Sequence, residues 1–163
     1  MPQAVDVDAV TDALLQASKA LVGIALRTLP DDPAVTLTQF RALALIDSAP
    51  DMRAADLADA LAVSPSTATR LCDRLVRADL LKRVASENDR REVRLFVTPA
   101  GATLVRDGLA RRRRALSRLV AQIPAADRVP FVRSLRVFEG AALTDKEPAW
   151  ALGWPGSPGG ATT

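Results

Sequence analysis

The chain has 163 residues, of which 48% are hydrophobic and 4% aromatic, and its formal net charge is +3; this is enough apolar material for one packed domain and too much for a disordered chain. It has no histidine and a single cysteine, which excludes a histidine-based triad, a HExxH zinc site and a cysteine-cluster metal site. Because no glycine-rich phosphate loop or dinucleotide fingerprint occurs either, we expect no enzyme, no catalytic residues, no cofactor and no metal.

The first predicted elements are two helices. Residues 6–29 carry apolar side chains at spacings of three and four, which is typical of a helix with one apolar face. After the break 30-PDDP-33, a second helix runs from Thr36 or Thr38 to Ser48. The N-terminal segment is acidic, unlike a signal peptide, and no segment approaches ~18 uninterrupted apolar residues. We therefore expect a cytoplasmic protein without a membrane span, and a lone cysteine fits that reducing compartment.

Two short helices follow in close succession, over 54–61 and 65–78. Ser64 is a strong N-cap for the second one, and Pro65 fits its first helical position. Both helices have an apolar stripe that faces the other, and small alanines stand where they cross. The pattern predicts a helix-turn-helix. The inward residues are Leu57, Ala58 and Leu61 on the first helix and Ala68, Leu71, Cys72 and Leu75 on the second.

The outer face of the second helix has short hydroxyl side chains at its start and arginines one and two turns later. Hydroxyls at such a position can reach base edges or phosphates, and arginine can bind guanine or the backbone. Two alternatives stay open: the hydroxyls cap or back-bond to their own helix, and the arginines pair with a neighbouring acid such as Asp73. The predicted DNA contacts are Ser66, Thr67, Thr69, Arg70 and Arg74.

A β-hairpin is predicted directly after this helix. Residues 81–85 and 93–97 read as short strands, and a charged segment that contains Asp89, Arg90 and Arg91 joins them. A hairpin beside a groove-bound helix forms a wing that lies along the sugar-phosphate backbone. Asp89 can accept hydrogen bonds that hold the tip, while Arg90 or Arg91 enters the narrow minor groove. The alternative is a solvated turn without a ligand.

The remaining elements are helical. Thr98-Pro99 is a second cap-plus-proline signal, and it begins a long helix over about 99–122. A last helix covers about 126–142. The segment 145–163 is rich in proline and glycine and has no periodicity, so we expect it to be flexible. The expected fold is mainly α with a small β-hairpin.

Three segments together resemble the MarR family of bacterial transcription regulators: 57-LADALAVSPSTATRLCDRLVRADLLKR-83, 89-DRR-91 and 95-LFVTPAG-101. The resemblance covers roughly residues 6–142. It implies a homodimer in which the N- and C-terminal helices of both subunits intertwine, and a winged helix-turn-helix that reads a palindromic operator in double-stranded DNA. Many members of that family release DNA when a small, often aromatic or lipophilic, effector binds between the dimer and DNA-binding regions.

The chain departs from the family pattern at three positions. Ala62 and Asp79 stand where glycine is common, and Arg53 stands where a threonine or serine cap is common. A peroxide-sensing branch of the family places its cysteine in the N-terminal helices near tyrosines. Here Cys72 falls on an apolar stripe and tyrosine is absent, so we expect a buried core thiol.

The resemblance divides the chain into four parts: an N-terminal dimerisation helix (1–35), a winged helix-turn-helix DNA-binding region (36–98), C-terminal dimerisation helices (99–144) and a flexible tail (145–163). We expect a sequence-specific transcription regulator, a repressor that a small ligand releases from DNA. The alternative is a winged-helix protein-interaction module without DNA binding. The side chains expected to form the shared dimer core are Leu14, Leu21, Phe131, Leu135 and Phe138.

Overall fold

The computed structural model describes residues 6–30, 35–49, 51–85 and 93–144. Six helices and one hairpin are found in these ranges, and every predicted element is confirmed with ends that differ by at most two residues. The elements are α1 (Val7–Arg27), α2 (Leu37–Ser48), α3 (Ala54–Leu61), α4 (Pro65–Arg77), β1 (Leu81–Ala85), β2 (Val93–Val97), α5 (Pro99–Ala121) and α6 (Ala125–Thr144). The predicted mainly α fold with a small β-hairpin is therefore correct.

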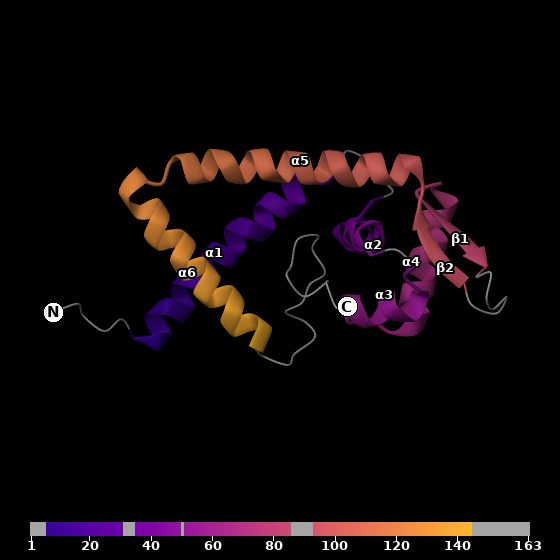
Figure 1. The fold of residues 1–163 in the computed structure, drawn as a ribbon, viewed down its shortest axis with the longest axis horizontal. Coiled ribbons are helices and arrows are strands. Elements are labelled where there is room, and N and C mark those ends of the chain that lie inside the picture. Colours follow the sequence, from indigo (N-terminus) through magenta and orange to yellow (C-terminus); the bar gives the residue numbers. More distant parts are fainter. Residues whose placement is uncertain (1–5, 31–34, 50, 86–92, 145–163) are drawn as a thin grey trace.

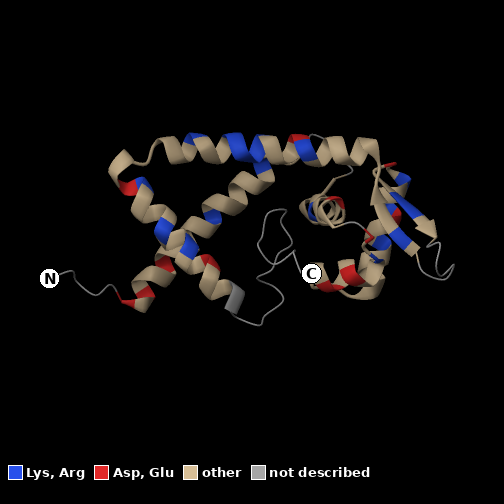
Figure 2. Ribbon diagram, viewed as in Figure 1, with Lys and Arg blue, Asp and Glu red and all other residues tan. Residues whose placement is uncertain are grey.

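The long helix α5 connects two parts of the molecule (Figure 1). At its N-terminal end lie α2, α3, α4 and the hairpin, and α5 contacts both α2 and β2 there. Toward its other end lie α1, which also contacts α5, and α6. Basic residues occur along the middle of α5 and around α4 and the hairpin, whereas the charged residues of α3 are acidic (Figure 2).

The hydrophobic core lies within α2, α3, α4 and the hairpin and extends onto α5. Helix α2 is central, because it is buried almost all round from Gln39 to Ile46. Burying these side chains is the main favourable contribution to the fold. The largest fully buried side chains are Leu43, Leu57, Leu75, Leu81, Leu95, Val105 and Cys72.

The turn that precedes α4 and the turn that follows it both use a left-handed residue. Ala62 has φ 53° and Asp79 has φ 57°, and these are the two positions where the family pattern has glycine. Asp tolerates this conformation better than alanine, for which a left-handed backbone costs roughly 1–2 kcal/mol. The threonine side chain of Thr98 supports the second turn, because its hydroxyl donates to the Asp79 carbonyl at 2.7 Å. Both departures from glycine are thus accommodated without a change of fold.

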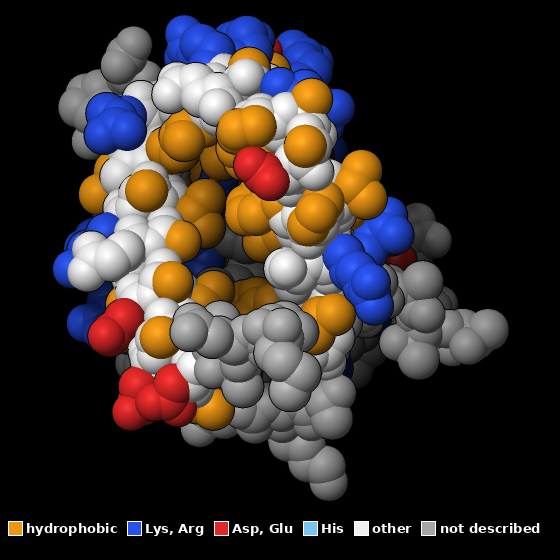
Figure 3. Space-filling view, turned by 90° about the vertical axis from the view of Figure 1, so that its left-hand side faces the viewer, with side chains coloured by type: hydrophobic (Ala, Val, Ile, Leu, Met, Phe, Trp, Pro, Cys, Tyr) orange, Lys and Arg blue, Asp and Glu red, His pale blue; other side chains and the backbone are white. Residues whose placement is uncertain are grey.

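Large apolar side chains on α1 and α6 are exposed, and they gather on the faces that line the hollow between the two helices (Figure 3). Among the described residues, α1 is the one helix long and apolar enough to cross a membrane by length and composition, with a hydropathy of 1.4 over its most apolar window. The expected core side chains on these helices are 38–47% exposed in the single chain: Leu14, Leu21, Phe131, Leu135 and Phe138.

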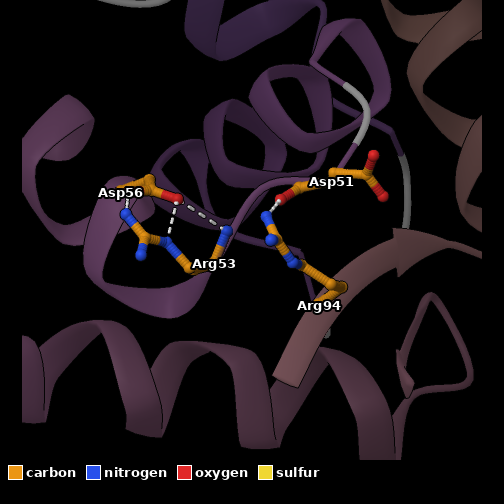
Figure 4. Close-up of polar contacts among 4 residues, drawn as sticks. All are labelled: Asp51, Arg53, Asp56 and Arg94. Atoms are coloured by element: carbon orange, nitrogen blue, oxygen red, sulfur yellow. Dashed lines mark hydrogen bonds and ion pairs between the residues drawn. The ribbon is translucent and has the colours of Figure 1, made fainter. Parts of the chain in front are cut away.

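The start of α3 is tied together by an arginine and an aspartate (Figure 4). Arg53 precedes the helix, and its guanidinium cannot accept a hydrogen bond, so it does not act as an ordinary cap. Instead the Asp56 carboxylate accepts from the Arg53 backbone N–H at 2.9 Å and from its guanidinium at 2.7 and 2.9 Å. Close by, Arg94 of β2 donates to the Asp51 carbonyl at 2.6 Å, which joins the hairpin to the segment before α3.

A test of the packing of α5 is Gly101→Ala. A Cβ at Gly101 would lie 2.2 Å from the Leu80 backbone oxygen, which cannot move away as a flexible side chain can. We expect the free energy of unfolding in urea to fall by roughly 1–3 kcal/mol. The matched control is Gly23→Ala, whose Cβ would make an ordinary contact of 3.5 Å inside α1; that variant should be unchanged or more stable. Equal stability of the two variants would contradict the close packing.

The Arg53 contact gives a second test, in acid. Hydrogen bonding from the Arg53 side chain, more than any other cause, lowers the pKa of Asp56 from 3.8 to about 2. Because the folded pKa is the lower one, the contact stabilises the fold above about pH 4, and this contribution disappears as the pH falls toward 2. The side chains are 50% and 39% exposed, so solvent screening keeps the contribution below ~1 kcal/mol.

We therefore expect Asp56→Asn to lower the free energy of unfolding at pH 6, with the gap to wild type closing between pH 4 and 2. Urea unfolding at a series of pH values measures this gap. Asp59→Asn removes a carboxylate from the same helix without touching the contact with Arg53, so it is the control for the change in net charge. A gap for Asp56→Asn that stays constant across the acid range would show that the ion pair does not stabilise α3.

Candidate nucleic-acid interface

Helix α4 is held by its inner face and presents its outer face to solvent. Ala68, Leu71, Cys72 and Leu75 are 0–8% exposed and pack into the core. Burial raises the pKa of the Cys72 thiol, which favours its protonated form; because Cys72 is fully buried, the predicted buried core thiol is confirmed. Ser66, Thr69, Arg70 and Arg74 are exposed, and Thr67 is half-buried.

The three hydroxyl side chains at the start of α4 make local hydrogen bonds. The hydroxyl oxygen of Ser64, the N-cap, lies 3.1 Å from the Ser66 hydroxyl and 2.9 Å from the Thr67 hydroxyl. The Thr69 hydroxyl donates to the Pro65 carbonyl at 2.9 Å. Back-bonding, part of the alternative given for these residues, thus occurs at Thr69, whereas the Ser66 and Thr67 hydroxyls bond to the side chain of the capping residue Ser64. The oxygens of the exposed hydroxyls keep lone pairs that can still accept from a ligand.

The acid beside the arginines of α4 has another partner. The Asp73 carboxylate pairs with Arg83 of β1 at 2.7 Å, and Arg83 also reaches the Thr69 carbonyl at 3.4 Å. Within the ranges that the structure describes, the side chains of Arg70 and Arg74 make no ion pair and no hydrogen bond. The alternative in which Asp73 neutralises these arginines therefore does not occur, and both cations face solvent.

The hairpin has the predicted strands and packs on the core by one face. Its antiparallel register runs from Leu81 opposite Val97 to Ala85 opposite Val93. Asp89, Arg90 and Arg91, the predicted wing-tip residues, lie outside the described residues. The base of the hairpin is joined to the rest of the region by Arg83, which bonds α4, and by Arg94.

Sequence reasoning missed Arg83, although the alternation of the strand contains a signal for it. In a strand, every second side chain lies on the same face. Leu81 is buried, and Arg83, two residues later, lies on the same face of the strand at an exposed position. Its ion pair with Asp73 fixes the hairpin against the helix.

Two of the cavities in the described part of the chain bear on the candidate site. One, of about 630 Å³, is lined by α5 and the start of α6 and combines apolar side chains with Arg112, Arg113 and Arg128. The other, of about 310 Å³, lies between the start of α2 and α4, with Thr38, Arg70 and Arg74 in its wall. No cluster of residues that could hold a metal ion is found in the described part of the chain.

Comparison with known proteins assigns this arrangement to a family. The model of the MarR family matches residues 35–93. The uncharacterized HTH-type transcriptional regulator YsmB of Bacillus subtilis (strain 168) is 28% identical over 102 residues, which are 63% of this chain and 70% of YsmB.

Solved structures resemble this chain over nearly its whole length. RV1404 from Mycobacterium tuberculosis is 36% identical, with a TM-score of 0.81, and the match covers 90% of this chain and 99% of RV1404. FabT of Streptococcus pneumoniae, solved in complex with DNA, has the same fold at 20% identity, with a TM-score of 0.75 and coverage of 87% and 100%. The chain therefore belongs to the MarR family of winged helix-turn-helix transcription regulators.

Proposed function

We propose that the chain is a cytoplasmic repressor that binds a palindromic operator in double-stranded DNA as a homodimer and leaves it when a small ligand binds. The observation that carries the DNA-binding part is the outer face of α4: Arg70 and Arg74 face solvent without a described partner, on a helix whose inner face is buried. A protein-interaction module would not need two unneutralised arginines on this face, so we prefer DNA binding to that alternative.

In the proposed complex, α4 enters the major groove. Arginine there recognises guanine or a phosphate, and hydroxyls contact base edges or the backbone. The hairpin follows the backbone, and Asp89 supports the tip from which Arg90 or Arg91 enters the minor groove. The complex of FabT with DNA supports this proposal, since that protein shares the fold. The proposed contacts on α4 are Ser66, Thr67, Thr69, Arg70 and Arg74.

The exposed apolar faces of α1 and α6 support the proposed homodimer. An apolar patch of this extent on a soluble protein usually marks an interaction surface. A second copy of the chain would cover both faces, and its two-fold axis would match a palindromic operator. This keeps the division into dimerisation helices (1–35 and 99–144) around a DNA-binding region (36–98).

The cavity beside α5 is our candidate for the effector site. Its wall offers Leu109, Leu116 and Val120 to an apolar or aromatic body and the guanidinium of Arg113 to an acidic group. Arg128 is already engaged, because it donates to the Ile123 carbonyl, just after α5, at 3.0 Å and to the Ala121 carbonyl, at the end of α5, at 3.2 Å. A small lipophilic or aromatic acid therefore fits this cavity best.

The test of DNA binding compares Arg70→Ala with Arg91→Ala. Arg70 on the groove-facing helix should contribute to base recognition, so its loss should cost roughly 1–3 kcal/mol on the operator and less on random DNA. Arg91 should respond to the charge and shape of the minor groove. Its loss should therefore lower the affinity for both duplexes by similar factors and reduce the salt dependence of binding by about one phosphate equivalent.

Affinities are measured by gel shift at several salt concentrations, on a duplex from upstream of the chain's own gene and on its scrambled version. Equal losses on both duplexes for Arg70→Ala would contradict base recognition by that residue. Wild-type affinity for Arg91→Ala would contradict the minor-groove role. A wild-type chain that binds neither duplex would contradict DNA binding altogether.

The homodimer is tested with Leu135→Asp. In a dimer this substitution buries an unpaired charge in the proposed shared core, which costs several kcal/mol. We expect the wild-type chain to sediment as a dimer at micromolar concentration and the variant to dissociate. Arg133→Asp on the same helix, whose side chain is charged already, should leave the mass unchanged. A folded wild-type monomer at that concentration would disprove the proposal.

A further inference from the structure

A cavity lies between the start of α2 and α4, and the proposed contacts of α4 with DNA do not account for its α2 side. It has a volume of about 310 Å³ and is lined by hydroxyl and guanidinium groups. A water molecule in the liquid occupies ~30 Å³, so the cavity has room for a phosphate group and several waters. Its wall includes Thr36, the N-cap of α2, together with Thr38 of α2 and Thr67, Arg70 and Arg74 of α4.

The charge of the wall favours an anion. Arg70 and Arg74 are one turn apart on α4, and neither has a partner among the described residues. Opposite them, the capping box at the start of α2 engages the Thr36 N–H at 2.7 Å and the Gln39 N–H at 3.3 Å. Two first-turn amides, those of Leu37 and Thr38, have no acceptor in the described part, as is general for a helix start. They add the positive end of a helix dipole to the arginine pair.

The position of the cavity indicates where the anion comes from. The hairpin holds α4 on the side of Thr69 and Asp73, through Arg83. The cavity lies on another side, where Thr67, Arg70 and Arg74 face α2. A helix in the major groove, which is ~12 Å wide, lies between two phosphate backbones that belong to opposite strands. If the hairpin follows one backbone, the start of α2 meets the other.

We propose that this cavity binds a backbone phosphate of the DNA strand opposite to the one that the hairpin follows, with Thr38 and Arg74 in direct contact. The proposal rests on the proposed DNA binding and adds α2 to the DNA-contacting surface. Phosphate contacts of this kind position a protein on the duplex and carry no sequence information. In this proposal the contact at Thr38 helps to fix the depth and tilt of α4 in the major groove. It acts on the side of α4 that the hairpin does not hold.

The test is Thr38→Asp, which separates binding from folding. A carboxylate in the first turn of α2 favours the helix, so the melting temperature should stay the same or rise. The same carboxylate would repel a phosphate, so we expect about a tenfold loss of affinity for both operator and scrambled duplex, and a salt slope smaller by about 0.9. Thr38→Asn is the neutral control, and Thr103→Asp on the exposed face of α5 makes the same change in net charge outside the cavity.

A scan of the protected duplex with single methylphosphonates identifies the phosphate. One neutralised position should weaken wild-type binding and should not weaken Thr38→Asp binding. The phosphate cavity is overturned if Thr38→Asp binds with wild-type affinity and salt slope, if Thr103→Asp loses as much affinity, or if no neutralised position distinguishes wild type from Thr38→Asp.

Titration of inorganic phosphate into the DNA-free protein separates a DNA phosphate from a free anion. Binding with a Kd below about 1 mM that Thr38→Asp abolishes would assign the cavity to a small anion and overturn the proposal; weaker or no binding supports it. A wild-type chain that binds no duplex would instead refute the proposed function, and the phosphate contact with it.

Discussion

The burial of one face of α4 is the constraint on which the rest of the interface depends. Leu71, Cys72 and Leu75 are at most 8% exposed against the core, so the helix cannot rotate without moving apolar surface into water, at a cost of roughly 25 cal/mol per Å². The fixed rotation determines which side chains face outward. It also determines that Arg70 is exposed on the outer face of the helix, where its charge is available to a polyanion.

The ion pair between Arg83 and Asp73 solves an electrostatic problem that this rotation creates. Asp73 lies beside Arg74 on α4, at the rim of the proposed DNA-binding surface, where an unpaired carboxylate would repel phosphate. Pairing it with the hairpin neutralises that charge and aligns the wing with the helix. The same pairing leaves the Asp73 carboxylate engaged with Arg83, so it does not neutralise Arg70 or Arg74 on the outer face. The Arg83 and Asp73 side chains are 36% and 39% exposed, so their ion pair contributes little to the free energy of unfolding. Its main effect is to hold the hairpin against α4 and to neutralise Asp73.

Local signals explain how much could be predicted from the sequence. Ser64-Pro65 and Thr98-Pro99 identified the starts of two helices because capping and proline chemistry depend on adjacent residues only. The departures at Ala62 and Asp79 were visible for the same reason. The Arg83–Asp73 pair and the cavity at Thr38 could not be predicted so directly, because each joins residues from different elements. Their proximity depends on how α2 and the hairpin pack around α4, which no short stretch of sequence specifies.

Helix α5 gives the two parts of the molecule a common mechanical element. At Gly108 it approaches the Phe40 ring so closely that a Cβ would lie 2.4 Å from it, and farther along Arg111 donates to the Thr28 carbonyl at the end of α1 at 3.3 Å. Because α5 packs closely on α2, a tilt of α5 at its C-terminal end would also move its N-terminal end. Since the proposed phosphate cavity is formed by the first turn of α2, a ligand that moves α5 against Phe40 would displace the cavity wall as well as α4. If a ligand binds the proposed effector site, the close contact at Gly108 would connect that site to DNA binding through packing, without a change inside α4.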